Sequence, residues 1–350
     1  MQRLLIIRFS ALGDVAMTVP VVHSLAKQYP DLRISVLTKK MAAPLFSFAP
    51  SNVEAMGVDL KQFDGLSGLN RLYKQLKERN FDAVADFHDV LRSKFLRTRF
   101  RLAGKKVAVI DKGRKEKQQL MGHGMDAEPL ISGTERYAAV LEKLELPISI
   151  DFDRAFNPRL QDYSAVEQAI GRKTAGERWV GIAPFAAHDT KVYPLKNMRR
   201  VAETLAQQGC RVLLFGAGQQ EKDILESWQA TNITSVCGLL GGLHNEMLLM
   251  ARLDAMLAMD SANMHIAALC GTPVVSIWGA THPKAGFAPY HQPLDNIISQ
   301  DDLPCRPCSV YGNKACKFGD NRCLTGIAPE TIVEKTLRIA TEKCLRQQKN

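Results

Sequence analysis

The segment Arg3-Leu-Leu-Ile-Ile-Arg-Phe-Ser-Ala-Leu-Gly-Asp14 decides the fold that we expect for this chain. Arg3 to Phe9 has the signature of a buried strand, the next five residues form a turn, and helical spacing follows over 15–29. Pro20 lies inside that helical stretch, so we expect a kink or a helix that starts near it. A buried strand, a turn and a helix together indicate one unit of a parallel α/β sheet.

The same alternation continues along the chain and then begins again after an irregular stretch over 146–159. The first set predicts strands at 32–37, 83–87 and 107–110 and helices at 66–79 and 134–144. The second set predicts strands at 179–183, 211–215, 233–236, 255–259 and 274–278 and helices at 197–208, 243–252, 262–269 and 329–345. The pattern predicts two doubly wound α/β domains facing a cleft, with ligands beyond the carboxyl ends of the strands.

Length and composition agree with a globular protein of about two domains. Of the 350 residues, 46% are hydrophobic and 23% are charged, which argues against a largely disordered chain. The sequence contains no run of 18 apolar residues, and its first apolar run is too short for a secretory signal. We therefore expect a cytoplasmic location.

The net charge of +10 is concentrated in one window, which runs from Arg92 to Lys117. The window is expected to attract a polyanion, which could be a nucleic acid, an anionic membrane surface or a phosphorylated acceptor. The alternative is a solvated basic face without a partner. Only Asp111 and Glu116 oppose its basic residues, which are Arg92, Lys94, Arg97, Arg99, Arg101, Lys105, Lys106, Lys112, Arg114, Lys115 and Lys117.

Asp14 is a candidate general base, because it follows the first strand and opens the first helix. Gly13 permits tight backbone geometry at this turn. Asp14 could equally serve as the N-cap of the helix, and the local sequence leaves both readings open.

Thr190 and Lys191 follow the first predicted strand of the second half, so they also lie at a carboxyl strand end. Their hydroxyl and ammonium groups are what a diphosphate needs. The alternative is an exposed loop without a ligand.

Asp260, Ser261, Ala262 and His265 stand between a predicted strand and its following helix. The aspartate and the serine are expected to cap the helix, with His265 one turn further on. The helix N-terminal amides suit a phosphate or a polyol. Helix capping with a core histidine is the alternative.

Four cysteines in the pattern C-x2-C-x7-C-x6-C could hold zinc or could be loop thiols without a metal: Cys305, Cys308, Cys316 and Cys323. Gly216-Ala-Gly218 lacks the third glycine of a dinucleotide-binding motif, and the chain has no Walker, G-x-S-x-G or H-E-x-x-H motif. The sequence offers no aspartate pair in a strand-end turn for a metal–nucleotide complex, since Asp151-Phe-Asp153 lies in the irregular stretch.

Together these segments resemble glycosyltransferase family nine, the ADP-heptose:lipopolysaccharide heptosyltransferases. The resemblance covers nearly the whole chain, and its motifs occur in the family's order. They are Arg8-Phe-Ser-Ala-Leu-Gly-Asp14, Phe81-Asp-Ala-Val-Ala-Asp-Phe-His88 with Arg92-Ser93, Gly133-Thr-Glu-Arg-Tyr137, Lys191-Val-Tyr-Pro194, Asp260-Ser-Ala-Asn-Met-His-Ile-Ala-Ala268 and the cysteine cluster that ends Cys323-Leu-Thr-Gly-Ile327. Three positions depart from the family: Tyr193 for its Trp, Ala262 for its usual Gly, and Gly218 near where some heptosyltransferases carry a Glu that contacts the nucleotide ribose.

The resemblance implies a GT-B fold and an inverting transfer of heptose from ADP-heptose, or a related nucleotide-sugar, to the lipopolysaccharide core, without a metal or other cofactor. It implies an acceptor domain over 1–160, a donor domain over 161–328 and a helix over 329–350 that could pack back on the first domain. It also implies peripheral contact with the cytoplasmic face of the inner membrane and no nucleic-acid partner. A donor other than ADP-heptose, or a non-catalytic polyanion-binding protein, is the alternative.

The resemblance assigns roles to particular residues. Asp14 is the expected base, and Lys191 is expected to neutralise the departing diphosphate. The expected donor-binding residues are Thr190, Lys191, Gly216, Asp260, Ser261, Ala262 and His265. The expected acceptor-binding residues are Ser10, Gly13, Arg92, Arg97, Arg99 and Arg101.

Overall fold

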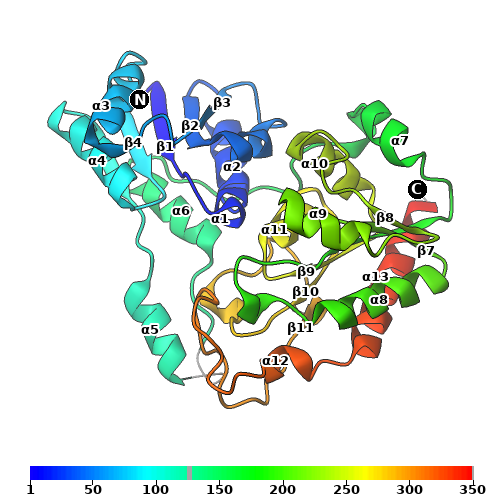
Figure 1. Ribbon diagram of the computed structural model, residues 1–350. Coiled ribbons are helices and arrows are strands. Elements are labelled where there is room, and N and C mark those ends of the chain that lie inside the picture. The colour runs from blue at the N-terminus through cyan, green and yellow to red at the C-terminus, as the bar shows by residue number, and fades with distance from the viewer. Residues whose placement is uncertain (124–127, 349–350) are drawn as a thin grey trace. The chain divides into compact units, whose positions relative to one another are not determined.

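The computed structural model describes residues 1–123 and 128–348, which form two compact units (Figure 1). The first unit comprises Met1–Gly113 and Ile131–Phe156, and the second comprises Arg114–Leu130 and Asn157–Asn350. The chain thus enters the second unit once before it returns to the first. The sequence analysis expects one boundary, at residue 160, and does not foresee this crossing. Residues 349 and 350 of the predicted C-terminal segment lie outside the described residues.

The sheet of the first unit is parallel throughout and has the strand order β3-β2-β1-β4-β5. This is the order of a Rossmann sheet, in which the strand sequence reverses between β1 and β4. The strands are β1 (Arg3–Ile7), β2 (Arg33–Lys39), β3 (Val53–Val58), β4 (Ala83–Asp86) and β5 (Lys106–Val109).

Successive side chains of β1 point to opposite faces of the sheet, and all of them after Arg3 are buried. Both faces of the sheet are therefore covered by helices of the first unit. Leu72 and Leu76 from one helix and Leu96 and Phe100 from the next pack against one face of the strands. Pro20 lies in the first turn of α2, which confirms that a helix starts near it. The elements are α1 (Leu12–Ala16), α2 (Val19–Gln28), the 3-10 segment η1 (Lys40–Phe46), α3 (Gly65–Lys77), α4 (Leu91–Leu102) and α6 (Gly133–Glu142).

The sheet of the second unit repeats this order with one more strand, as β11-β10-β9-β6-β7-β8, and is also parallel. Its strand sequence reverses between β6 and β9. The strands are β6 (Arg178–Ala183), β7 (Cys210–Leu214), β8 (Ile233–Ser235), β9 (Ala255–Met259), β10 (Val274–Ile277) and β11 (Ile297–Ile298). The two Rossmann-like units confirm the predicted fold class.

The C-terminal helix α13 (Pro329–Gln348) packs against α8, β6 and β9 of the second unit. These contacts make the helix part of the second unit. The other helices of the second unit are α5 (Arg114–His123), α7 (Ser164–Ile170), α8 (Leu195–Gln207), α9 (Gly218–Glu226), α10 (Leu243–Arg252), α11 (Ala262–Leu269) and α12 (Arg322–Thr325). Short 3-10 turns are η3 (Pro158–Leu160), η4 (Asp189–Lys191), η5 (Pro283–Ala285) and η6 (Leu294–Asn296).

The basic window is divided between the two units, although the predicted acceptor domain over 1–160 contains all of it. Residues 92–112 belong to the first unit, whereas Arg114, Lys115 and Lys117 begin α5 in the second. Lys117 is buried there, with its ammonium 4.4 Å from the centre of the Phe287 ring. Within the described residues, no helix is both long and apolar enough to cross a bilayer.

Candidate functional site

The predicted site residues lie mainly at the strand-order reversals of the two sheets. In the first unit, Ser10, Gly13 and Asp14 follow β1, and the turn after β4 lies next to them. In the second unit, η4 follows β6 and Asp260 follows β9, which pairs with β6. Such reversals are where parallel α/β sheets bind ligands, because the loops on either side diverge there.

Asp14 is held by an ion pair and a backbone hydrogen bond. Its Oδ2 lies 2.6 Å from Nη2 of Arg8 and accepts a hydrogen bond from the Ala11 amide at 3.1 Å. Ala11 is the N-cap of α1, so Asp14 is the third helical residue and not the N-cap that the sequence allowed. The carboxylate therefore closes the first turn of α1. Its side chain is 28% exposed, which leaves it accessible to a ligand.

Arg8 is the partner that the sequence analysis did not single out. Its residue is 7% exposed, and its Nη1 donates to the Phe87 carbonyl at 2.8 Å. Tyr137 of α6 lies beside it, with the guanidinium 5.9 Å from the ring centre, and donates its hydroxyl to the Asp14 carbonyl at 3.3 Å. The Glu-Arg-Tyr helix thus supports the turn that carries Asp14, although it is distant in sequence.

His88 completes this centre as a neutral imidazole. Burial and the charges of Arg8 and Lys112 lower its pKa to about 3. Its Nδ1 accepts a hydrogen bond from the Phe9 amide at 3.3 Å, which ties the β4 turn to the end of β1. His88 therefore has a positioning role that its place in the family-like motif did not reveal.

Arg97, expected to contact an acceptor, is engaged within the protein. Its Nη1 lies 2.7 Å from Oδ2 of Asp86 and 2.8 Å from Oδ1 of Asp89. Asp86 is fully buried and also accepts from the amides of His88 and Asp89. Arg97 thus neutralises a buried carboxylate beneath the β4 turn, and a role in acceptor binding stays a prediction.

The other expected acceptor residues lie along α4. Arg92 pairs with Asp64 at 2.9 Å, and the Arg99 guanidinium lies 4.9 Å from the centre of the Tyr73 ring. Arg99 and Arg101 are both exposed. These arginines therefore form an exposed basic surface, which differs from the enclosed environment of Arg97.

In the second unit, Lys191 and Asp260 form an ion pair that their separate predicted roles did not foresee. Nζ of Lys191 lies 2.8 Å from Oδ2 of Asp260, and the two side chains are 14% and 9% exposed. The same oxygen accepts the Thr281 hydroxyl at 2.7 Å. A partly buried ammonium paired with one carboxylate can exchange that partner for a phosphate, because both are anionic acceptors.

Two glycines allow neighbouring loops to approach this pair. A Cβ on Gly279 would lie 2.5 Å from the Thr190 carbonyl, and one on Gly312 would collide with the Lys191 side chain. Thr190 is buried, and it donates its hydroxyl to the Gly312 carbonyl at 2.5 Å. In this structure the hydroxyl therefore holds the loop at Gly312. The placement of Lys191 therefore depends on segments that lie far apart in the sequence.

Ser261, Ala262 and His265 begin α11 next to Asp260. Ser261 occupies the N-cap position but its side chain does not cap the helix, and its Oγ is buried without a hydrogen-bond partner in the described part of the chain. His265 is buried one turn further on. Gly216 lies elsewhere, two residues after β7, where a Cβ would be 2.9 Å from the Leu225 side chain. Its packing against α9 explains the glycine without a ligand.

The four cysteines of the predicted zinc motif line one cavity of about 440 Å³ in the second unit, with Arg306 and Phe318. All four are free thiols. Burial raises the pKa of Cys323 to about 11, which disfavours its thiolate. Over residues 1–123 and 128–348, no group of three or more His, Cys, Asp or Glu side chains is arranged to hold a metal ion. A zinc site at these cysteines and loop thiols without a metal both stay predictions.

Comparison with known proteins places the chain among glycosyltransferases. Residues 69–318 match the model of glycosyltransferase family 9 (heptosyltransferase). The lipopolysaccharide core heptosyltransferase OpsX of Haemophilus influenzae is 28% identical over 311 residues, which cover 85% of this chain and 84% of that protein. Lipooligosaccharide heptosyltransferase 2 of the same organism is 27% identical over 360 residues, covering 95% and 98%.

A solved structure shares the fold along almost the whole chain. The ADP-heptose lps heptosyltransferase II of E. coli has a TM-score of 0.71 and 20% sequence identity, and the match covers 97% of this chain and 99% of that one. The two Rossmann-like sheets are therefore an arrangement that this chain has in common with a heptosyltransferase.

Proposed function

The chain belongs to glycosyltransferase family 9, the heptosyltransferases, and from that membership we propose that it transfers a heptose from ADP-heptose to the lipopolysaccharide inner core. The family identifies it as an enzyme, so a non-catalytic polyanion-binding protein is no longer favoured. The observation that carries the proposal is the placement of Asp14 and Lys191, each at the strand-order reversal of its own sheet.

Asp14 acts as the general base in this proposal. Within the described residues, its ion pair and hydrogen bond both use Oδ2, so Oδ1 remains for the acceptor hydroxyl. The base withdraws the hydroxyl proton while the oxygen attacks the anomeric carbon of the donor, and the bond to the diphosphate breaks. A single displacement inverts the anomeric configuration, which NMR of the product would report.

Lys191 stabilises the departing diphosphate in place of a metal ion. When the donor binds, the ammonium turns from Asp260 to the phosphate oxygens, where negative charge grows in the transition state. Asp260 then accepts hydrogen bonds from donor hydroxyls, and the amides that begin α11 contact the phosphates. The low exposure of the pair strengthens these interactions, because little water screens them.

Incubation with ADP-heptose and a lipid acceptor that carries an inner-core sugar tests the proposal directly. Release of ADP that depends on the acceptor supports it, and absence of ADP release with every inner-core acceptor contradicts it. A related nucleotide-sugar as donor is the second candidate, since Ala262 stands where the family usually has Gly. Thermal shift with a panel of nucleotide-sugars separates the two, because the true donor stabilises the native state most.

The exposed basic side of α4 is proposed to hold the protein at the cytoplasmic face of the inner membrane. Arg99, Arg101 and the neighbouring Lys105 supply the charge, and Leu91 and Leu102 are 85% and 80% exposed at the two ends of the helix. Basic residues attract anionic lipid headgroups, and exposed leucines can enter the interface.

Reversal of Arg99, Arg101 and Lys105 to Glu should weaken binding to anionic vesicles by roughly a hundredfold or more, because each basic residue near such a surface contributes about 1 kcal/mol. Vesicle sedimentation measures the effect, and wild-type binding should fall with salt. Reversal of the exposed Lys196, Arg199 and Arg200 of α8 changes the net charge equally and serves as the control. Equal vesicle binding by the two variants would refute the assignment to α4.

A further inference from the structure

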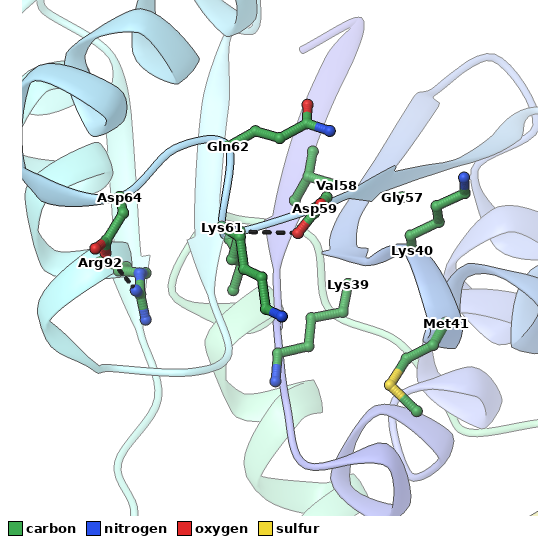
Figure 2. A pocket seen from close by; sticks show the side chains of 11 residues that line it. Lys39, Lys40, Met41, Gly57, Val58, Asp59, Lys61, Gln62, Asp64 and Arg92 are labelled. Carbon is green, nitrogen blue, oxygen red and sulfur yellow. Dashed lines mark hydrogen bonds and ion pairs between the residues drawn. The ribbon is translucent and has the colours of Figure 1, made fainter. Parts of the chain in front are cut away.

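A cavity of about 820 Å³ in the first unit was not foreseen from the sequence (Figure 2). It lies where β2 and β3 end, since Lys39 is the last residue of β2 and Val58 the last of β3. Four cationic and two acidic side chains line it, namely Lys39, Lys40, Lys61, Arg92, Asp59 and Asp64. These six groups leave a local net charge of +2.

The backbone around the cavity is held in place by two local features. A Cβ on Gly57 would lie only 3.0 Å from the Cα of Lys40, so the glycine lets η1 pack closely on β3. Asp59 accepts the Lys61 amide at 3.0 Å and shapes the loop that leads to α3 (Figure 2). The lysines therefore project from a defined scaffold of two strand ends and one turn.

The two acidic groups leave most of the lysine charge unopposed. Asp64 pairs with Arg92 at 2.9 Å, and Asp59 is bound to backbone. Across the described residues, Lys39, Lys40 and Lys61 form no ion pair, although they share one concave surface. Three like charges gathered in a hollow repel one another, and a bound anion would relieve that repulsion.

The cavity adjoins the strand that leads to Asp14. The amide of Arg8 donates to the Leu37 carbonyl at 3.0 Å, and Lys39 follows two residues later on β2. The charge of Lys39 also contributes to the low pKa of His88, which hydrogen-bonds the Phe9 amide. Because β1 and β2 are parallel neighbours, the turn that carries Asp14 and the cavity lie at the same edge of the sheet.

We propose that this cavity is an anion subsite for a phosphate monoester on the acceptor, close to the hydroxyl that receives the sugar. A phosphate monoester carries about −1.5 to −2 at pH 7, which matches the net charge of the lining groups. A carboxylate carries one negative charge and would neutralise only half of the net positive charge of the lining groups. The role as an acceptor subsite rests on the proposed function, whereas phosphate binding itself does not.

Titration calorimetry on the full chain at low salt tests phosphate binding without any turnover. The probes are a monosaccharide phosphate monoester, the same sugar unphosphorylated and the corresponding sugar acid. The Lys39→Gln, Lys61→Gln double variant should bind the phosphorylated sugar at least about tenfold more weakly, because charge-assisted hydrogen bonds are lost. Lys77→Gln on the exposed side of α3 is the matched control. Equal affinity in the double variant, or a sugar acid bound as tightly as the phosphate, would overturn the subsite.

A transfer assay with phosphorylated and dephosphorylated forms of one lipid acceptor then separates the subsite from the proposed function. The preference for the phosphorylated form, taken as the ratio of kcat/KM values, should fall about tenfold in the double variant. Inorganic phosphate should compete with the phosphorylated acceptor, which distinguishes recognition of the phosphate group from recognition of the lipid. Transfer without any preference for phosphate refutes the acceptor subsite and leaves the proposed function intact. Lysine-dependent phosphate binding without transfer to either acceptor supports an anion site and contradicts the proposed function.

Discussion

Asp14→Asn is expected to lower kcat by about 100- to 10,000-fold, the usual cost of losing a general base. Asparagine has almost the same shape as aspartate, and its carbonyl oxygen can still accept from the Ala11 amide. Donor affinity, measured by calorimetry with ADP, should change little because Asp14 lies in the first unit. The matched control is Asp153→Asn, which removes an exposed carboxylate that pairs with Arg154 in the same unit.

A structural effect of this substitution has to be separated from a chemical one. The variant leaves the buried Arg8 guanidinium without its carboxylate, so some loss of stability is expected. Thermal denaturation measures that loss. A pH profile of kcat distinguishes the base, since the acidic limb that the base produces should be absent from the variant. Turnover equal to the wild type would show that Asp14 only closes the first turn of α1.

The sequence predicts the buried strands well because their apolar runs are continuous. β9 and α11 have the predicted bounds, and β1 begins where expected. In contrast, β3 reads Val-Glu-Ala-Met-Gly-Val at a sheet edge and is half-exposed, so neither alternation nor an apolar run marks it. The cavity at the ends of β2 and β3 was missed for the same reason.

Pairings between distant residues were beyond the reach of the sequence. Lys191 and Asp260 meet because β6 and β9 are neighbours in the sheet, a fact that strand order supplies and local spacing does not. In the sequence, Arg97 is one member of a basic run. In the fold, it projects from α4 and forms an ion pair with the buried Asp86. Charge counting locates a basic segment, but only the fold shows which cations are already neutralised.

Lys191→Ala should raise the KM for the donor and lower kcat by about 100- to 1,000-fold, which is typical for removal of one group that stabilises transition-state charge. The substitution also removes the ion-pair partner of Asp260, whose largely buried negative charge then lies beside the expected diphosphate. We therefore expect that adding Asp260→Asn to the variant recovers part of the affinity for ADP, because the repulsion is removed. Lys196→Ala, an exposed lysine of α8, is the matched control.

The same variant tests whether an ammonium takes the place of a metal ion. If Lys191 neutralises the diphosphate, wild-type turnover should persist in EDTA, and magnesium should restore little activity to Lys191→Ala. Wild-type activity that disappears with EDTA and returns with magnesium would contradict the metal-free mechanism. ADP affinity that is unchanged in Lys191→Ala would instead place the diphosphate elsewhere in the second unit. The EDTA experiment reports on catalysis, whereas the ADP affinity of the variant reports on binding. Lys191 is expected to contribute to catalysis and to binding from one position next to Asp260.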